Sequence, residues 1–428
     1  GALAKVDVPN AAQKSVQRQW LGLELREPWT VGGRTYPAGA YLVTDFDAFM
    51  AGERKFDVLF EPTATTSLAG ATLTRNHVVL NVFDDVKNRI SVLTHGADGW
   101  TSQPLKVGDG GIGTTSVGAV DADENDLLWV TTTSYLSPTT LLLADAAQPD
   151  ATAQPLKSMP EFFDASRHVV EQHFATSKDG TRVPYFLVRP KDLALDGSTP
   201  TLLYGYGGFE IPMVPGYSGG MGRSWLDKGG VYVVANIRGG GEYGPRWHQA
   251  ALKQNRHKAY EDFAAVAQDL VKRGITAPRH LGIQGGSNGG LLTGNMLTQY
   301  PELFGAVVVQ VPLLDMKRYN KLLAGASWMA EYGDPDKPEE WAFIQKFSPY
   351  HLFDPARTYP PVLFTTSTRD DRVHPGHARK MAARMIEAGK DVDYYENIEG
   401  GHGGAANNAQ AAHMSALAYS FLWDKLSR

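Results

Sequence analysis

A serine flanked by glycines is the residue in this sequence that most directly suggests chemistry. Ser287 lies in the segment GGSNG at 285–289, directly after a short apolar run and directly before a helical pattern. A G-x-S-x-G segment between a strand and a helix makes a sharp, strained turn that exposes the serine hydroxyl. The N-terminus of the following helix adds partial positive charge beside that hydroxyl. The segment therefore predicts a nucleophilic serine.

A serine hydroxyl is a poor nucleophile unless a base accepts its proton and an acid orients that base. In α/β-hydrolases the three residues follow the chain order Ser, Asp or Glu, His. Asp370 and Asp371 come directly after an expected strand, and His402 lies in the glycine-rich loop after the next strand. We therefore expect His402 as the base and one of the two aspartates as the acid. This pattern does not separate Asp370 from Asp371.

Several other motifs favour a structural reading over a chemical one. His374 and His377 have no supporting acid at zinc-site spacing, so we expect no metal. The glycine-rich loop 238–242 lacks the Lys-Ser/Thr of a phosphate-binding P-loop. Residues 108–113 match G-x-G-x-x-G without a following helix, and residues 121–126 lack the glycine of a calcium loop. We expect ordinary loops and turns in these three segments.

Length and composition describe an ordinary globular protein. The 428 residues are 43% hydrophobic and 20% charged, with no cysteine and a formal net charge of −5. This charge gives no reason to expect nucleic acid or an anionic membrane as a partner, and the lack of cysteine excludes disulfides and thiolate chemistry. No apolar run approaches the roughly 20 residues that span a bilayer. We expect a soluble protein without a cofactor, cytoplasmic rather than periplasmic.

Two kinds of periodicity divide the chain near residue 164. Up to that point, turn clusters separate short β-rich segments at 41–44, 78–83, 89–93, 127–133 and 140–143. Strong strands begin near 41, 78 and 127, spacings of 37 and 49 residues, close to the roughly 40–50 residues of a four-stranded propeller blade. We expect residues 1–164 to form about three blades of a partial β-propeller, with a β-sandwich as the alternative.

From residue 165 onward, β-rich runs alternate with helical periodicity, which is typical of a mostly parallel sheet with crossover helices. The expected strands lie at 169–175, 183–188, 201–204, 231–237, 281–284, 306–310, 362–366 and 392–397. Helical spacing of apolar residues marks three core-facing stripes, one ending at Val271, one at Ile386 and one near the C-terminus. We expect residues 165–428 to form a doubly wound α/β domain with its nucleophile in the middle.

Four segments together resemble the prolyl oligopeptidase family of serine peptidases. They are YGYGGF at 204–209, NIRGGGEYG at 236–244, GGSNGG at 285–290 and DDRV at 370–373. The resemblance covers all of the second half and is looser over the first half. It implies an α/β-hydrolase domain joined to a seven-bladed propeller, which caps the active site and admits only short peptides.

The resemblance also assigns roles to single residues. It implies Ser287 as the nucleophile, the first of the two aspartates, Asp370, as the orienting acid, and His402 as the base. The hydroxyl of Tyr206 and the backbone N–H of Asn288 would stabilise the oxyanion.

The same resemblance implies a substrate pocket. Arg372 would bind the substrate carbonyl at P2. Trp328 and Tyr332 lie one helical turn apart, a spacing more often found in a core. The resemblance moves Trp328 from core to pocket, because an indole face suits a flat pyrrolidine ring. The residues implied to line the P1 proline pocket are Phe209, Asn288, Trp328, Tyr332 and Val373.

Two departures from the family pattern keep alternatives open. Pro312 and Leu313, with the segment EYGDP at 331–335, are similar to the oligopeptidase B branch, which prefers basic P1 residues, and Leu313 joins the candidate pocket. About three blades precede the hydrolase domain where the family has seven. We therefore expect a separate N-terminal fragment or a second chain to complete the propeller.

The expected activity is hydrolysis of short peptides on the carboxyl side of proline, through an acyl-enzyme on Ser287. The enzymatic alternatives are cleavage after Arg or Lys, and an acylaminoacyl peptidase or esterase with the same triad. The non-enzymatic alternative is a propeller-based binding module with an inactive hydrolase.

Overall fold

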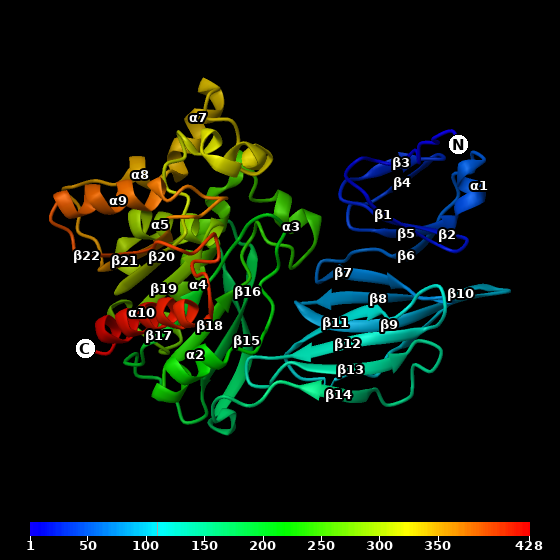
Figure 1. Ribbon diagram of the computed structural model, residues 1–428, viewed down its shortest axis with the longest axis horizontal. Coiled ribbons are helices and arrows are strands. Elements are labelled where there is room, and N and C mark those ends of the chain that lie inside the picture. The colour runs from blue at the N-terminus through cyan, green and yellow to red at the C-terminus, as the bar shows by residue number, and fades with distance from the viewer. Residues whose placement is uncertain (109) are drawn as a thin grey trace. The chain divides into compact units, whose positions relative to one another are not determined.

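The computed structural model describes every residue except Asp109, so this part of the expected loop at 108–113 lies outside the described residues. The chain forms two compact units (Figure 1). The first consists of Gly1–Pro160, Val214–Tyr217 and Glu242–Trp247, and the second of Glu161–Met213, Ser218–Gly241 and His248–Arg428.

The first unit contains three antiparallel sheets of four strands each, in which the strands follow one another as a meander. The first sheet consists of β1 (Gln13–Gln17), β2 (Trp20–Glu24), β5 (Tyr41–Asp45) and β6 (Asp57–Phe60). The second consists of β7 (Thr66–Leu73), β8 (His77–Asp84), β9 (Lys87–Gly96) and β10 (Gly99–Pro104). The third consists of β11 (Thr114–Ala119), β12 (Leu127–Thr133), β13 (Thr140–Asp145) and β14 (Gln154–Ser158). A hairpin of β3 (Trp29–Val31) and β4 (Arg34–Tyr36) and the short helix α1 (Phe46–Met50) lie within the first sheet's connections.

Alternation along β8 explains how these sheets pack. Side chains of successive strand residues point to opposite faces, and Val78 and Val79 are both 1% exposed. Val78 belongs to an apolar cluster shared with Tyr41 of the first sheet, whereas Val79 belongs to one shared with Leu128 of the third sheet. The second sheet is therefore covered by apolar clusters on both faces. Three sheets of four strands match the predicted blades in number and size, and the propeller itself stays a prediction.

The second unit is built on one sheet of eight strands, and all eight predicted strands are present with bounds within two residues of the prediction. They are β15 (His168–Thr176), β16 (Arg182–Pro190), β17 (Thr201–Tyr204), β18 (Val231–Ala235), β19 (Leu281–Gly286), β20 (Ala306–Gln310), β21 (Val362–Ser367) and β22 (Val392–Asn397). Their spatial order is β15-β16-β18-β17-β19-β20-β21-β22. The strands from β18 to β22 are parallel, which confirms the expected α/β architecture.

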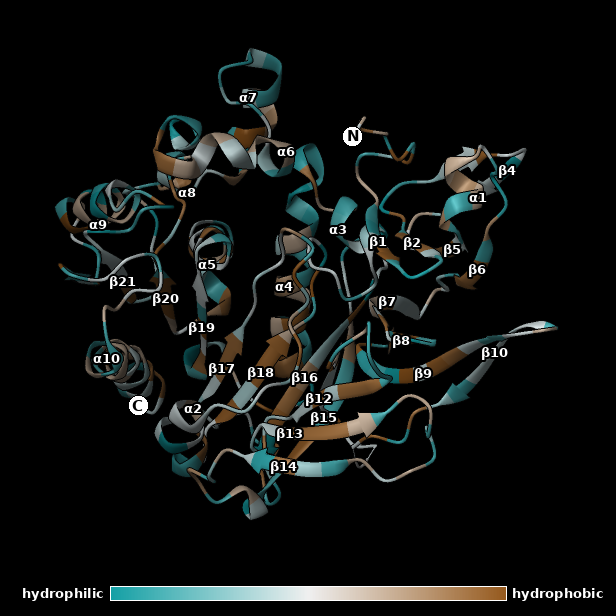
Figure 2. Cartoon of the chain, turned by 45° about the vertical axis from the view of Figure 1, so that its right-hand side comes forward, coloured by the Kyte–Doolittle hydropathy of each residue, from teal (hydrophilic) through white to brown (hydrophobic). Residues whose placement is uncertain are grey.

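Helices cover both faces of this sheet. Figure 2 shows α2 (Gly219–Ser224) and α10 (Asn408–Leu426) on one face, and α4 (His257–Lys272), α5 (Asn288–Gln299) and α9 (Gly376–Glu387) on the other. The predicted stripes were wrong at two positions, because Val271 and Ile386 are 36% and 52% exposed. Each directly follows a buried residue, and one step along a helix turns a side chain about 100° away from the core.

Short helices occupy the connections, namely α3 (Pro245–Gln249), α6 (Met329–Tyr332), α7 (Pro338–Ile344) and α8 (Pro349–Leu352). Nowhere in the described chain is a helix both long and apolar enough to cross a membrane.

Strand register brings the candidate catalytic residues to one end of the parallel strands. Gly286 of β19 pairs with Gln310 of β20, which pairs with Thr365 of β21, which in turn pairs with Tyr395 of β22. The carboxyl ends of these parallel strands therefore share one rim. The loops that leave this rim carry the serine, the two aspartates and the histidine singled out above.

Candidate active site

Ser287 forms the turn between β19 and α5. Its φ of 59° and ψ of −117° lie where non-glycine residues are rare. The backbone N–H of Ser287 donates to the carbonyl of Gln310 at 2.9 Å, and its own carbonyl accepts the N–H of Leu291 at 3.0 Å. A Cβ at Gly285 would collide with the backbone of Gly289, so this tight turn requires glycine there. Ser287 is partly exposed, and its hydroxyl makes no hydrogen bond within the described part of the chain.

Asp370 and His402 are in direct contact. Nδ1 of His402 lies 2.8 Å from Oδ2 of Asp370, and the backbone N–H groups of Arg372 and Val373 both donate to Oδ1 at 2.9 Å. Burial would raise the pKa of Asp370, but these three hydrogen bonds lower it below its ordinary value, so the carboxylate is ionised at neutral pH. Asp371 is exposed, whereas Asp370 is buried. The structure therefore distinguishes two aspartates that the sequence pattern did not.

The loop that carries His402 is anchored where it leaves β22. Oδ1 of Asn397 accepts the backbone N–H groups of Glu399 and Gly400, each at 2.9 Å. No hydrogen bond joins Nε2 of His402 to the Ser287 hydroxyl among the residues described here. The structure thus pairs the candidate acid with the candidate base, and places the candidate nucleophile on the same rim without a direct bond to them.

Two hydrogen-bond donors lie beside the serine turn. Asn288 is the first residue of α5, and its backbone N–H has no acceptor among the described residues, as is usual in the first turn of a helix. The side-chain Nδ2 of Asn288 donates to the carbonyl of Tyr206 at 2.8 Å. Burial raises the pKa of Tyr206 despite the nearby positive charges of Arg256 and Arg372, so its hydroxyl is protonated at neutral pH. The N–H and the hydroxyl are both suited to stabilise a developing oxyanion.

The predicted pocket residues divide into buried and accessible ones. The rings of Phe209 and Tyr332 pack edge to face with centroids 5.7 Å apart. Tyr332 is fully buried, and Leu313 and Val373 are each 2% exposed. Phe209 and Trp328 are half-buried and offer surface to a ligand.

Arg372 is exposed, and its guanidinium makes no hydrogen bond or ion pair within the described part of the chain. Its charge nevertheless acts on the Tyr206 hydroxyl. The cation predicted to bind the P2 carbonyl therefore acts electrostatically on one of the two candidate oxyanion donors.

A buried ion-pair network behind the pocket was missed by the sequence analysis. Nη1 of Arg256 lies 3.2 Å from Oε1 of Glu331, and Nε2 of His248 lies 2.7 Å from Oε2 of Glu331. Nη2 of Arg256 donates to Oδ1 of Asn288 and to the carbonyl of Gly207, both at 2.7 Å. Burial would raise the pKa of Glu331, but the hydrogen bond from His248 and the charge of Arg256 lower it, so Glu331 is ionised. The sequence signal for Glu331 was its position directly before Tyr332, a candidate pocket residue. No sequence motif pointed to Arg256.

The motifs expected to be structural have structural contacts. Nδ1 of the buried His377 accepts two backbone N–H groups at 3.0 Å, and Nδ1 of His374 accepts one at 2.9 Å. In the loop at 238–242, the guanidinium of Arg238 pairs with Asp262 and Asp179 rather than remaining available for a phosphate. Among the described residues, no three His, Cys, Asp or Glu side chains gather as a metal site.

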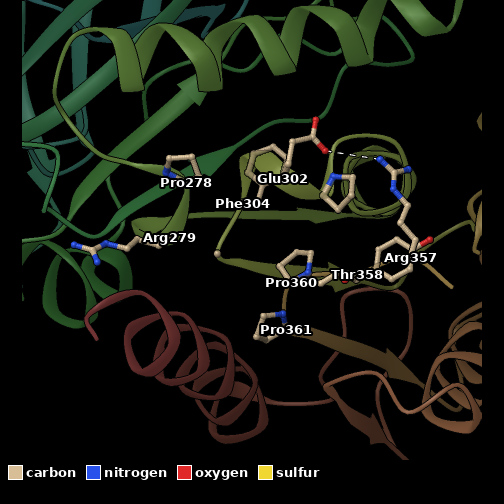
Figure 3. Close-up of a pocket in the computed structure, with 11 residues that line it drawn as sticks. Pro278, Arg279, Glu302, Phe304, Arg357, Thr358, Pro360 and Pro361 are labelled. Carbon is tan, nitrogen blue, oxygen red and sulfur yellow. Dashed lines mark ion pairs between the residues drawn. The ribbon is translucent and has the colours of Figure 1, made fainter. Parts of the chain in front are cut away.

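A separate hollow lies at the amino-terminal end of the parallel strands, where β19, β20 and β21 begin (Figure 3). Prolines and aromatic rings line much of it, and Glu302 faces Arg357 across it at 3.8 Å. Strands of five or six residues, roughly 17–20 Å long, separate this hollow from the Ser287 rim. It is therefore not part of the candidate active site.

Comparison with known proteins identifies the α/β unit. The prolyl oligopeptidase family matches residues 219–428, the segment that contains Ser287, Asp370 and His402. The chain belongs to the prolyl oligopeptidase family. This confirms the resemblance found in the sequence, and Tyr206 and Phe209 lie before the matched residues.

Individual relatives match between 69% and 98% of this chain. The "Uncharacterized peptidase y4nA" of Sinorhizobium fredii is 49% identical over 94% of this chain and 55% of its own length. The prolyl endopeptidase of Elizabethkingia miricola is 37% identical over 69% of this chain and 42% of its own length. The structure of a post-proline cleaving enzyme from Rickettsia typhi matches with a TM-score of 0.91 and 34% identity, over 98% of this chain and 61% of that one. The chain thus spans between 42% and 61% of the length of these three relatives.

Proposed function

We propose that this protein is a serine peptidase that hydrolyses short peptides on the carboxyl side of proline. Ser287 is the nucleophile, His402 the base and Asp370 the acid that orients it. The observation that carries the proposal is the 2.8 Å contact between His402 and Asp370, on the same rim of the sheet as the strained Ser287 turn. Membership of the prolyl oligopeptidase family supports the same assignment.

The geometry suits acyl transfer in two steps. His402 accepts the proton of the Ser287 hydroxyl as the serine oxygen attacks the scissile carbonyl, and Asp370 stabilises the imidazolium that forms. The Tyr206 hydroxyl and the Asn288 N–H donate to the oxyanion. His402 then gives its proton to the leaving amine, and the acyl group stays on Ser287. Water, deprotonated by His402, releases the acid and restores the serine.

The charges behind the pocket favour proline over a basic residue at P1. A P1 Lys or Arg needs an accessible carboxylate, but Glu331 is 4% exposed and already paired with Arg256 and His248. Glu210 lies 3.7 Å from His248. Phe209 and Trp328 leave an uncharged aromatic surface, which suits a pyrrolidine ring. The names of the Elizabethkingia and Rickettsia relatives point the same way.

The three antiparallel sheets of the first unit are, on this proposal, blades of a β-propeller that restricts substrates to short peptides. Their meander order and the apolar clusters on both faces of the second sheet support this reading. Arg372 would bind the P2 carbonyl of such a peptide, since its exposed guanidinium carries no other contact within the described part of the chain.

The proposal is tested with a panel of peptide amides of matched length that carry Pro, Arg, Lys or Ala at P1, together with a simple p-nitrophenyl ester. We expect cleavage after Pro to exceed cleavage after Arg or Lys, and the Ser287→Ala variant to lose about 10⁶ in kcat while it folds normally. A preference for Arg or Lys would overturn the assigned specificity. Full activity in clean Ser287→Ala protein would overturn the assigned nucleophile.

A further inference from the structure

One buried cation contacts both segments that carry the proposed oxyanion donors. Nη2 of Arg256 donates to the carbonyl of Gly207, which follows Tyr206, and to the side-chain oxygen of Asn288, each at 2.7 Å. Nδ2 of Asn288 donates in turn to the carbonyl of Tyr206 at 2.8 Å. These contacts close a small ring. The ring fixes the distance between the loop of Tyr206, whose hydroxyl is one proposed donor, and the turn of Asn288, whose backbone N–H is the other.

The loop that carries Tyr206 needs such support because its backbone is strained. Phe209 and Glu210 have φ values of 56° and 58°, in the left-handed region that non-glycine residues seldom adopt. Oε1 of Glu331 accepts the backbone N–H of Phe209 at 2.9 Å and also pairs with Arg256. Three residues of this loop, Tyr206, Gly207 and Phe209, are therefore held by Asn288, Arg256 and Glu331 in turn.

We propose that Arg256 is a positioning residue for the oxyanion site, with Glu331 as its counter-ion. It holds the Tyr206 hydroxyl in place relative to the Asn288 N–H and touches no substrate itself. The inference rests on the proposed peptidase function. It assigns Arg256 an effect on transition-state stabilisation rather than on substrate affinity, because both donors act on charge that develops only in the transition state.

The planar fork of arginine explains why lysine cannot replace it. Nη1 reaches Glu331 while Nη2 reaches Gly207 and Asn288, so one rigid group holds three segments. A lysine ammonium is a compact point charge without this fixed geometry. An Arg256→Lys variant keeps the buried positive charge beside Glu331 but loses the bridge between Gly207 and Asn288. It therefore distinguishes the positioning of the oxyanion donors from neutralisation of the Glu331 charge.

The test is a double-mutant cycle between Arg256→Lys and Tyr206→Phe, read as kcat and KM on a post-proline peptide. Removal of one oxyanion donor typically costs about 10²–10³ in kcat, and we expect this loss for Tyr206→Phe. Arg256→Lys should lower kcat by about 10-fold or more, with KM within about twofold of wild type. In the Tyr206→Phe background the effect of Arg256→Lys should fall to about threefold or less, because the donor that it positions is already gone.

The matched control is Arg238→Lys. Arg238 is also a buried arginine in a carboxylate network, 4% exposed and paired with Asp262 and Asp179, but its side chain touches neither Gly207 nor Asn288. The fold-change in kcat caused by Arg238→Lys should be the same in the wild-type and Tyr206→Phe backgrounds. If Arg256→Lys also lowers kcat by the same factor in both backgrounds, or changes KM alone, the positioning role is wrong. An inactive wild-type enzyme would instead remove the proposed function on which the inference rests.

Discussion

The carboxylate of Asp370 and the imidazole of His402 meet at 2.8 Å, although the two residues are 32 positions apart in the chain. The contact forms because β21 and β22 are neighbouring parallel strands, so the loops after them leave the sheet at the same rim. Asp370 has its second oxygen occupied by two backbone N–H groups, which leaves Oδ2 to orient the imidazole.

Asp370→Asn should lower kcat by about 10⁴ with little change in folding, because the amide no longer holds the imidazole in the productive tautomer or stabilises its charged form. The measurement is kcat on a post-proline peptide. Asp371→Asn is the matched control, since Asp371 is adjacent and exposed, and it should retain activity within about twofold. Equal losses in the two variants would contradict the assignment of Asp370 as the acid.

Glu396 ties the loop of the acid to β22 and should make stability depend on pH. Arg379 Nε donates to it at 3.0 Å and the Thr368 hydroxyl at 2.6 Å. The hydrogen bond from Arg379 outweighs the opposing effect of burial and lowers the pKa of Glu396 from 4.5 to about 2. Since the folded pKa lies below the unfolded one, this stabilisation is present above pH 4.5 and is lost as the pH falls toward about 2.

Urea denaturation of wild type and Glu396→Gln at a series of pH values measures this effect. The difference in the free energy of unfolding between the two proteins should be constant near neutral pH and shrink through the acidic range. A difference that does not change with pH would show that Glu396 contributes no ionised interaction.

Trp328→Ala distinguishes a proline pocket from a basic-specific one. Loss of the half-buried indole should reduce kcat/KM for post-proline peptides by about 10²-fold or more, since burial of an aromatic ring against the substrate contributes on the order of 3 kcal/mol. Trp341→Ala, at another half-buried tryptophan packed on the same core, controls for lost packing. Retained post-proline cleavage in Trp328→Ala would place the P1 side chain elsewhere.

Glu331→Gln should destabilise the protein strongly. It keeps an acceptor for the Phe209 N–H but leaves Arg256, 1% exposed, as a buried charge without its counter-ion, which typically costs about 3–5 kcal/mol. The measurement is the free energy of unfolding from chemical denaturation. Glu387→Gln, at an exposed position of α9, should stay within about 0.5 kcal/mol of wild type. A Glu331→Gln variant as stable as this control would mean that the Arg256 charge is compensated elsewhere.

The parallel sheet was predictable because its central strands are buried on both faces and read as continuous apolar runs. The strands β17, β20 and β22 were predicted with their observed bounds. In the first unit seven strands of the three sheets were missed, namely the edge strands β1, β6, β7, β10, β11 and β14 and the inner strand β2. The residues of β1, β10 and β14 are mostly polar and exposed. An edge strand forms through backbone pairing with its neighbour, and its side chains carry little record of this.

The candidate site was predictable where the chemistry is carried by local motifs. Ser287 lies in a five-residue pattern that encodes its own strained turn, and the positions of Asp370 and His402 follow from the strands before them. The Arg256–Glu331 pair joins residues 75 positions apart. Its formation depends on how the segment before α4, which carries Arg256, packs against α6, which carries Glu331, and no residue pattern near Arg256 expresses that packing.

Whether His402 activates Ser287 as a nucleophile is measured by covalent labelling with a fluorophosphonate probe, followed by mass spectrometry of the digested protein. We expect one adduct on the peptide that contains Ser287, no adduct in Ser287→Ala, and much slower labelling in His402→Asn. An adduct on another residue, or labelling at the wild-type rate in His402→Asn, would contradict the claim that His402 activates Ser287.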